Sequence, residues 1–267
     1  MEIPQEHIVN DVVREIYGDR IDPNDTDLHS KVVLSCRNKM VNELNERIME
    51  RLEGREKEYN AISSVPKNSN FEDYDKIVVD YPEEFLQSLQ FSGMSLQKLK
   101  LKEGAIVMLL RNLNMREGLC NGTRMKVIKM NDYSMVGKII AGNHKGEIVV
   151  IPRIKLLTNT KKLPFTMARI QIPVIPAFAM TINKSQGQSF DKVGIYLDTP
   201  VFSHGQLYVA LSRTTNKAGL KIEIKEDSEQ GHLIRNDPRV FTKNVVFKAY
   251  DRWAYPPLLK KDPRDRP

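Results

Sequence analysis

The chain has 267 residues, of which 40% are hydrophobic and 28% are charged, and its formal net charge is +7. This composition is typical of a folded globular protein, and it excludes a disordered, collagen-like or disulfide-built chain. The basic surplus is compatible with a polyanionic partner but does not require one.

No targeting or membrane segment is evident in the sequence. The acidic N-terminus, residues 1–6, lacks an apolar signal core, and no run approaches the roughly 18 apolar residues of a membrane span. Two cysteines, Cys36 and Cys120, cannot build a disulfide framework, and the five histidines have no metal-ligand spacing. We therefore expect an intracellular protein with reduced thiols and no bound metal of its own.

The first predicted segment, residues 1–80, has the texture of an α/β domain. Helical spacing of apolar residues predicts a helix over 6–17 that ends at Gly18, and a buried strand is expected over 32–36. Asn38 is the expected N-cap of the next helix, whose buried stripe is Val41, Leu44, Ile48 and Leu52. A strand followed directly by a helix is half of an α/β unit. Residues 55–85 are mixed and polar and are interpreted as a surface loop or linker.

The second predicted segment, residues 81–165, contains short strands and no helix between them. Strands are expected over 105–110, 125–130, 136–140 and 147–151, with a tight turn at Asn121–Gly122. This pattern favours a small β-barrel inserted into the α/β domain.

The α/β texture returns in residues 166–250. An irregular strand over 170–179 is interrupted by prolines, and a regular strand is predicted over 192–197. A helix over 206–213, with Ser203 and Gln206 forming a capping box, precedes a strand over 220–224. The proline-rich tail, residues 251–267, is expected to be disordered.

Residues 177–190 concentrate small hydroxyls, amides, a lysine and a glycine between two predicted strands. Loops at strand ends are where such sheets bind ligands. Gly187 would allow close backbone approach, and Thr181, Lys184 and Ser185 could hold phosphate oxygens. On composition alone, a simple polar connection is the favoured alternative.

Residues 206–215 place Arg213 at the end of an apolar helix. A guanidinium there could contact a phosphate in the manner of an arginine finger. It could equally cap the helix C-terminus and favour its dipole, so the two interpretations carry equal weight for this residue alone.

Taken together, the two segments resemble a known family. Thr-Ile-Asn-Lys-Ser-Gln-Gly at 181–187, followed by Leu-Tyr-Val-Ala-Leu-Ser-Arg at 207–213, resembles the fifth and sixth motifs of Pif-type helicases. These are RecD-like enzymes of superfamily one, and close variants occur in Helitron transposons. Residues 33–38 resemble the family's fourth motif, and 118–124 resemble part of its inserted barrel. The resemblance covers about residues 1–250.

The resemblance implies a fold and a role for individual residues. The fold would be a second RecA-like motor domain, a parallel sheet with helices, carrying a small β-barrel. Arg213 would reach the γ-phosphate of ATP, and Gln186, Gly187 and Arg37 would lie at the nucleotide. The expected contacts to single-stranded DNA are Thr181, Asn183, Lys184 and Ser185. Many relatives have His where this chain has Asn183, so a contact that needs an imidazole is not expected.

The sequence also departs from a complete motor. No Gly-x-x-x-x-Gly-Lys-Ser/Thr motif occurs, and no acidic pair follows a strand as Mg²⁺ binding requires. In the family these parts belong to a first RecA-like motor domain, which would bind most of the ATP and Mg²⁺ and which we expect as a partner in cis or in trans. We therefore expect no ATP hydrolysis by this chain alone.

Two function classes remain after the sequence is read. The first is the C-terminal portion of an ATP-dependent 5′-to-3′ DNA helicase, with a nuclear location and roles in repair, recombination or telomere maintenance implied by the family. The second is a non-catalytic module that binds single-stranded nucleic acid. Basic residues of the predicted barrel could line a DNA path, although at least half of them are expected to be ordinary solvated residues; they are Lys98, Lys100, Lys102, Arg111, Arg116, Arg124, Lys126 and Lys129.

Overall fold

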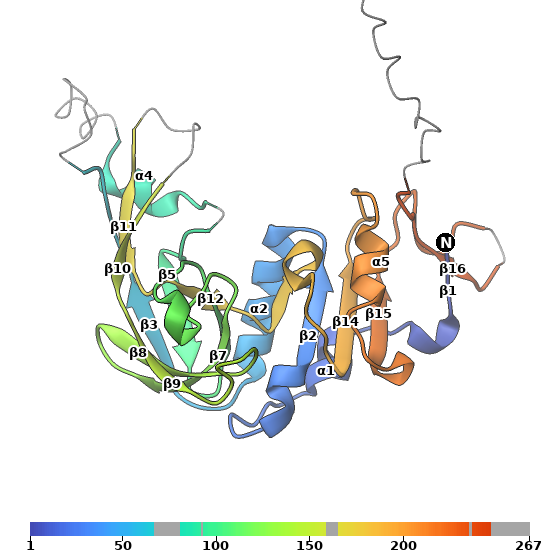
Figure 1. Ribbon diagram of the computed structural model, residues 1–267. Coiled ribbons are helices and arrows are strands. Elements are labelled where there is room, and N and C mark those ends of the chain that lie inside the picture. The colour runs from blue at the N-terminus through green and yellow to red at the C-terminus, as the bar shows by residue number, and fades with distance from the viewer. Residues whose placement is uncertain (67–80, 92, 159–164, 235–236, 247–267) are drawn as a thin grey trace, which may run out of the picture.

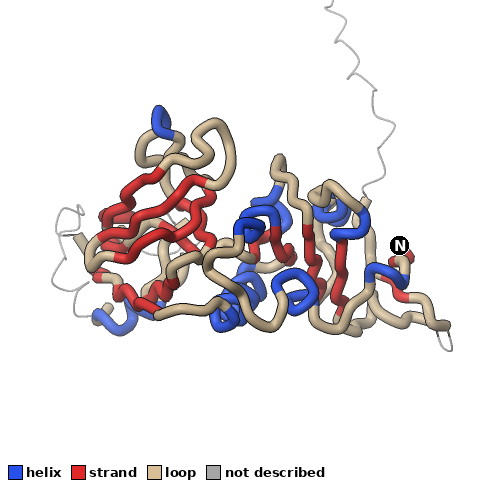
Figure 2. Tube along the Cα trace, turned by 90° about the horizontal axis from the view of Figure 1, so that it is seen from below, coloured by secondary structure: helices blue, strands red, loops and turns tan. Residues whose placement is uncertain are grey.

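The computed structural model of the protein describes residues 1–66, 81–91, 93–158, 165–234 and 237–246. The strands form two groups, and Figure 1 and Figure 2 show one group next to the other along the length of the molecule. One group is a parallel sheet with helices, here called the α/β body. The other consists of antiparallel sheets, here called the antiparallel body. The predicted disordered tail, residues 251–267, lies outside the described residues.

The α/β body is built on a four-stranded parallel sheet. Its strand order is β13 (Ala179–Thr181), β2 (Lys31–Ser35), β14 (Lys192–Leu197) and β15 (Leu220–Ile224). All three pairings are parallel, with Thr181 opposite Ser35 and Ser35 opposite Tyr196. Apolar side chains of β2 and β14 are fully buried, as expected for strands covered on both faces. The predicted parallel α/β fold is therefore confirmed.

Helices α1 (Val12–Tyr17) and α2 (Asn38–Arg51) pack on this sheet. Asp11 caps α1 by accepting from the backbone amides of Val13 and Arg14, and Gly18, at φ 82°, ends the helix. The predicted start at residue 6 is wrong: residues Gln5–His7 form a separate 3-10 turn, and Asp11 is the residue that can satisfy the first free amides.

The N-terminus of α2 also differs from the prediction. Arg37 is the N-cap residue and provides no side-chain cap, while Asn38 is already helical. The predicted stripe of Val41, Leu44, Ile48 and Leu52 is buried. Asn45, between those residues, is buried as well: its amide nitrogen donates to the Val41 and Ala179 carbonyls, and its oxygen accepts from the Ala179 amide. This side chain joins α2 to β13.

One glycine in the sheet is required by packing. A Cβ on Gly194 of β14 would lie 2.5 Å from a methyl carbon of Val12 and 2.9 Å from Ile16. Since real Cβ atoms do not approach other atoms so closely, glycine at this position lets α1 lie directly on the sheet.

The antiparallel body contains three sheets. The largest has the order β12 (Val174–Pro176), β6 (Ile106–Leu109), β7 (Arg124–Met130), β8 (Ser134–Ile139) and β9 (Ile148–Pro152). A second has the order β10 (Ile154–Leu157), β11 (Ala168–Gln171) and β4 (Ile62–Ser64). The third pairs β3 (Glu56–Asn60) with β5 (Lys98–Lys102), and the short helix α4 (Glu83–Ser88) contacts β4.

The antiparallel body uses more of the chain than residues 81–165. Strands β3 and β4 lie in the segment interpreted as a linker, yet they pair with β5 and β11. The sequence of β3, Glu-Lys-Glu-Tyr-Asn, has one buried residue, Tyr59, so it lacks the apolar pattern that identifies strands. The chain thus leaves the α/β body after α2 and returns to it at β13.

The two bodies meet through basic side chains of the antiparallel body. Lys102 donates to the Leu52 carbonyl at 2.7 Å, Arg124 to the His29 carbonyl at 3.1 Å, and Lys126 to the Asp25 carbonyl at 3.0 Å. The acceptors are backbone oxygens of the α/β body. Gly104, at φ 85°, lies so close to Pro23 that an added Cβ would overlap it. The joint is therefore a packed and hydrogen-bonded contact.

Hydrophobic packing follows the same division. One core runs through the α/β body and into the five-stranded sheet. A second, small core lies under α4 and consists of Val65, Leu86, Met94, Leu156, Phe165 and Met167. Beside it Arg169 is fully buried, and it donates to the Ser63 hydroxyl and to the carbonyls of Leu86, Leu89 and Ser95.

The remaining described elements complete the α/β body. Helix α5 (Gln206–Leu211) lies between β14 and β15 in the chain, and β1 (Glu2–Ile3) pairs with β16 (Val240–Phe241). In the predicted capping box, Gln206 accepts from the Ser203 amide, but Gly205 is the N-cap and Ser203 supplies no side-chain cap. Within the described part of the chain, no helix is long and apolar enough to cross a membrane, and no group of His, Cys, Asp and Glu could hold a metal ion.

Candidate functional site

Two of the predicted site residues, Thr181 and Arg37, lie at the edge of the parallel sheet where its strands end, whereas the Arg213 backbone is bonded to Phe190 just before β14 begins. Thr181 ends β13, Arg37 follows β2 by two residues, and Asp198 follows β14. Because these strands are parallel, their carboxyl ends meet at one edge, which is where α/β sheets bind ligands. Sequence segments far apart in the chain are thereby brought together.

A short 3-10 turn, η4 (Ile182–Ser185), carries the residues predicted to contact DNA. Asn183 and Lys184 are exposed, and Thr181 is half-buried. Ser185 is buried, and its hydroxyl donates to the Ile182 carbonyl at 2.7 Å. Ser185 therefore stabilises the turn in this structure, while its neighbours face solvent.

Lys184 has an unusual environment for an exposed lysine. Partial desolvation by the surrounding protein lowers the pKa of its ammonium from the ordinary value. The residue lines a cleft rather than an open surface. A cation held at the rim of a cleft is well placed to meet an anionic ligand that enters it.

The turn after η4 is open. Gln186 and Gly187 are exposed, and Gly187 has φ 79° with no atom within 4 Å of the position that a Cβ would take. The turn is closed by the Gln188 amide, which donates to the Ser185 carbonyl, and by the Gln188 side chain, which donates to the Lys184 carbonyl. A ligand could approach the backbone here without displacing a side chain.

Arg213 connects the two motifs physically. Its guanidinium donates to the carbonyls of Val209 at 2.9 Å and Gln188 at 2.9 Å, and to the Ser212 hydroxyl at 2.8 Å. A longer contact reaches the Ser185 carbonyl at 3.5 Å. The side chain is half-buried and bound mainly to backbone oxygens. It holds the end of α5, as the capping alternative predicts, and it also lies against the fifth-motif turn; its contact with a phosphate stays a prediction.

Arg37 stands apart from these contacts. It is exposed at the start of α2, directly after Cys36. Burial, with Asp198 nearby, raises the pKa of the Cys36 thiol to about 12, so this cysteine is protonated at neutral pH and has no nucleophilic character. Arg37 is the one group of this pair that is available to a ligand.

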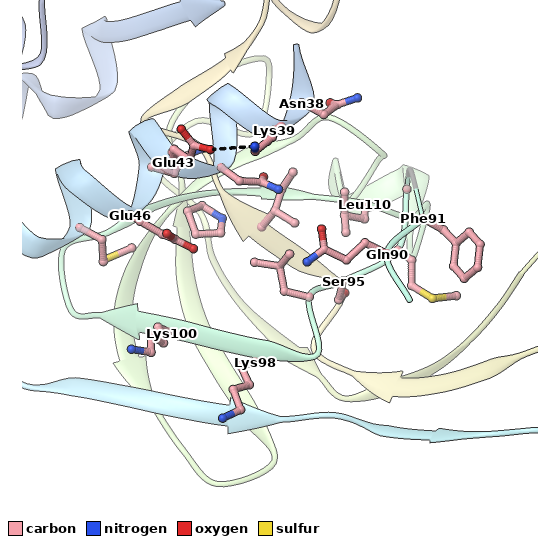
Figure 3. A pocket seen from close by; sticks show the side chains of 18 of the residues that line it. Asn38, Lys39, Glu43, Glu46, Gln90, Phe91, Ser95, Lys98, Lys100 and Leu110 are labelled. Carbon is pink, nitrogen blue, oxygen red and sulfur yellow. Dashed lines mark ion pairs between the residues drawn. The ribbon is translucent and has the colours of Figure 1, made fainter. Parts of the chain in front are cut away.

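A cleft of about 770 Å³ separates α2 from the antiparallel body. Figure 3 shows α2 on one side, with Asn38, Lys39, Glu43 and Glu46, and β5 on the other, with Lys98 and Lys100. Lys39 and Glu43 form an ion pair at 3.9 Å, and Lys100 pairs with Glu56 at 3.4 Å. Lys184 reaches the same cleft from η4. The walls thus combine amides, carboxylates of α2 and β3, and lysines of α2, β5 and η4.

Sequence patterns could not identify this cleft, because its walls come from residues 38–50, 90–100 and 169–184. Among the basic residues considered as a DNA path, Lys98 and Lys100 line it. By contrast, Lys102, Arg124 and Lys126 bind carbonyl oxygens where the two bodies meet. For these eight basic residues the sequence predicted either a DNA path or ordinary solvation. It did not predict that three of them would form hydrogen bonds between the two bodies.

Two family models match the chain. The model described as "DNA helicase Pif1, 2B domain" matches residues 84–130, and that described as "Viral superfamily 1 RNA helicase core domain" matches residues 111–221. The first covers much of the antiparallel body, and the second continues through both motifs of the α/β body.

Curated relatives and solved structures give the same result. The ATP-dependent DNA helicase PIF1 of Xenopus laevis is 31% identical over 190 residues, which are 67% of this chain and 25% of the relative. The crystal structure of Pif1 helicase from Candida albicans matches with a TM-score of 0.53 and 26% identity over 77% of this chain and 50% of that one. Pif1 helicase from Bacteroides in complex with ADP-AlF3 and ssDNA matches with a TM-score of 0.51 and 22% identity over 81% and 47%. The chain spans about a quarter of the length of the first curated relatives that it matches.

Proposed function

Since the chain belongs to the Pif1-type helicase family, we propose that it forms the C-terminal part of an ATP-dependent 5′-to-3′ DNA helicase. In this proposal the α/β body is the second RecA-like motor domain, and the antiparallel body, which includes β3 and β4 before residue 81 and β11 and β12 after residue 165, is its inserted domain. The motif variants favour the Helitron-like branch. The observation that carries the proposal is Arg213, whose guanidinium joins the fifth-motif turn to the end of α5 in the sixth motif.

The ligand of the cleft is proposed to be single-stranded DNA. Lys184 and Asn183 lie exposed on η4, and Lys98 and Lys100 face α2 across the opening. A single strand needs cations along its backbone, and the half-buried Phe91 offers aromatic surface to a base. The Bacteroides relative was solved with ssDNA, which agrees with this assignment. Thr181 would add a hydroxyl donor to the same backbone path.

ATP and Mg²⁺ are proposed to be bound mainly by a first motor domain, in cis or in trans. The residues of this chain fit part of that ligand: Arg213 carries a guanidinium against the open turn of Gln186 and Gly187, and Arg37 carries an exposed guanidinium after β2. Guanidinium groups stabilise charge on a transferring phosphoryl group. To act so, Arg213 would exchange its carbonyl partners for phosphate oxygens. Action on DNA would place the protein in the nucleus or the mitochondrion, in repair, recombination or telomere maintenance.

A second candidate function is a non-catalytic module that binds single-stranded nucleic acid. The contacts of Arg213 with the Val209 and Gln188 carbonyls give this residue a structural role that such a module would also need. The two candidates share DNA binding and differ in whether a first motor domain restores ATP turnover.

The test is a titration of the purified chain with fluorescent oligothymidine at low and physiological salt. We expect binding that weakens with salt, because cations that contact phosphates release counterions. Lys184→Ala should weaken binding several-fold and reduce the salt slope by roughly one. Lys192→Ala is the matched control: it is also an exposed lysine, but it begins β14 at the opposite edge of the sheet.

Two results would contradict the proposal. An unchanged salt slope in Lys184→Ala would remove η4 from the DNA path. An equal loss of binding in Lys192→Ala would show that net charge, rather than the cleft, attracts the oligonucleotide.

A further inference from the structure

Arg124 is a buried arginine that belongs to one body and ends in the other. It begins β7 of the antiparallel body and is 4% exposed. Its guanidinium donates to the His29 carbonyl at 3.1 Å and to the Ala177 carbonyl at 3.4 Å. These two residues lie just before β2 and β13 of the α/β body. Arg124 therefore enters the sheet whose strands lead to the predicted site.

This arginine lacks the partner that usually accompanies a buried cation. No carboxylate within the described part of the chain forms an ion pair with Arg124, and its Nε hydrogen has no acceptor. Burial lowers the pKa of Arg124 to about 10, so it remains charged at neutral pH. A buried charge without a carboxylate is costly, and an apolar residue would fill the same space at lower cost. The position of the guanidinium, rather than stability, explains its presence.

What the guanidinium contacts is an aromatic ring at the end of the fifth motif. Its central carbon lies 5.0 Å from the centroid of the Phe190 ring, a cation–π contact in a desolvated setting. Phe190 is itself fully packed, with 2% of its surface exposed. The antiparallel body thus contacts the α/β body at the residue that closes the fifth-motif loop.

Phe190 is in turn paired with the strand of chain that carries Arg213. The Phe190 amide donates to the Arg213 carbonyl at 2.9 Å, and the Thr215 amide donates to the Phe190 carbonyl at 2.9 Å. Phe190 and Thr214 form an isolated parallel bridge. Displacement of the Phe190 ring would therefore displace the backbone on both sides of Thr214, including that of Arg213.

We propose that Arg124 is a positioning residue: by way of Phe190 it fixes the backbone that carries Arg213, so the seating of the antiparallel body sets the place of the finger. The functional part of this inference rests on the proposed helicase role. In that role the cleft between the bodies holds DNA. A bound DNA strand that moves the antiparallel body would also move Arg124, and the ring contact would then move Phe190. DNA binding would in this way change the position of the Arg213 backbone, and with it the place of the guanidinium proposed to contact the nucleotide.

The test measures amide hydrogen exchange of the whole chain at Phe190 and Thr215. Arg124→Lys keeps the charge but loses the planar group that stacks on the ring and reaches two carbonyls, so exchange at both amides should rise at least tenfold. Phe190→Leu should have a similar effect, and the double variant should go little further. Lys126→Met is the matched control, since Lys126 lies two residues along β7 and binds Asp25 but not Phe190. It should leave both amides within twofold of the parent.

The amide of Ile195, in the centre of the parallel sheet, reports general unfolding. A rise at Phe190 and Thr215 that exceeds any rise at Ile195 supports the proposal. Unchanged exchange in Arg124→Lys, or an equal rise in Lys126→Met, overturns it. If Arg124→Lys unfolds the chain, Phe190→Leu decides by the same comparison.

A second arm adds saturating oligothymidine. In the parent, the oligonucleotide should slow exchange at Phe190 and Thr215, and in Arg124→Lys it should bind without slowing them. Equal slowing in both would overturn the coupling. Failure of the parent to bind oligothymidine would instead overturn the proposed function, while the first arm would still show whether Arg124 positions the loop.

Discussion

Each of the two bodies contains a buried polar side chain that joins its elements, and the two side chains bind different kinds of partner. In the α/β body, Asn45 joins α2 to β13, two regular elements that already pack together. In the antiparallel body, Arg169 binds the Ser63 hydroxyl and the carbonyls of Leu86, Leu89 and Ser95, three separate stretches of chain. In the parallel sheet, backbone amides and carbonyls bond to one another. In the antiparallel body, Arg169 instead donates to carbonyls that no strand pairs with.

The largest effect is therefore expected from Arg169→Ala. The substitution would leave several buried acceptors without a donor, and we expect a loss of about 3–5 kcal/mol in the free energy of unfolding. Urea denaturation monitored by far-UV circular dichroism would measure this loss. Arg116→Ala, at an exposed arginine of the same body, should change stability by no more than about 0.5 kcal/mol. A similar loss of unfolding free energy in the two variants would mean that the hydrogen bonds of Arg169 do not stabilise this body.

A smaller effect is expected in the α/β body from Asn45→Ala. The change removes three hydrogen bonds but leaves the strand pairing of β13 with β2 intact, so we expect a loss of about 2–3 kcal/mol by the same assay. Asn42→Ala, one turn earlier on α2 and only half-buried, should be within about 0.5 kcal/mol of the parent because alanine favours the helix. A loss for Asn45→Ala that equals or exceeds the loss for Arg169→Ala would reverse the comparison.

The smallest effect is expected at the joint between the bodies, from Asp25→Asn. Burial opposes ionisation of Asp25, but a hydrogen bond from Lys31 and another from the Asp27 amide outweigh it and lower its pKa below the model-peptide value of 3.8. A carboxylate whose pKa is lowered by folding contributes stability above pH 3.8, and this contribution is lost as the pH falls through the lower, folded value. Because Asp25 is partly exposed, solvent screening limits the effect to at most about 1 kcal/mol at pH 7.

The measurement is urea denaturation of the parent and Asp25→Asn at pH 7, 5 and 3. The difference in the free energy of unfolding between the parent and Asp25→Asn should be equal at pH 7 and pH 5 and smaller at pH 3. A difference that grows towards pH 3 would have the wrong sign for a lowered pKa. Asp19→Asn, an exposed aspartate of the same body, provides the control.

The parallel sheet could be predicted from the sequence because its central strands, β2 and β14, contain continuous apolar runs. Strand β14 has the predicted bounds of 192–197, and the prolines at 173 and 176 divide the irregular stretch into β11, β12 and β13 as their missing amide hydrogens require. Strands β3 and β4 were missed, since their residues are mostly polar and only their partners show that they are strands.

The site divides in the same way. Composition between two predicted strands selected Lys184, the end of a predicted helix selected Arg213, and only the family resemblance selected Asn183; their roles stay predictions. The sequence could not show that Ser185 points inward or that the Arg213 guanidinium binds the Gln188 carbonyl, since both depend on how two distant segments pack. Arg124 was considered only as a basic residue of the barrel, and no local pattern distinguishes a buried arginine from an exposed one.

The sheet order has a consequence for how the protein is made. Strand β2 lies between β13 and β14, and both of these follow the whole antiparallel body in the sequence. On the ribosome, β2 would emerge with Val32, Val33 and Leu34 exposed and with both of its edges unpaired until the antiparallel body has been synthesised. The stretch around β2 is thus open to contact with other chains during synthesis, and slow translation through the antiparallel body would prolong that exposure.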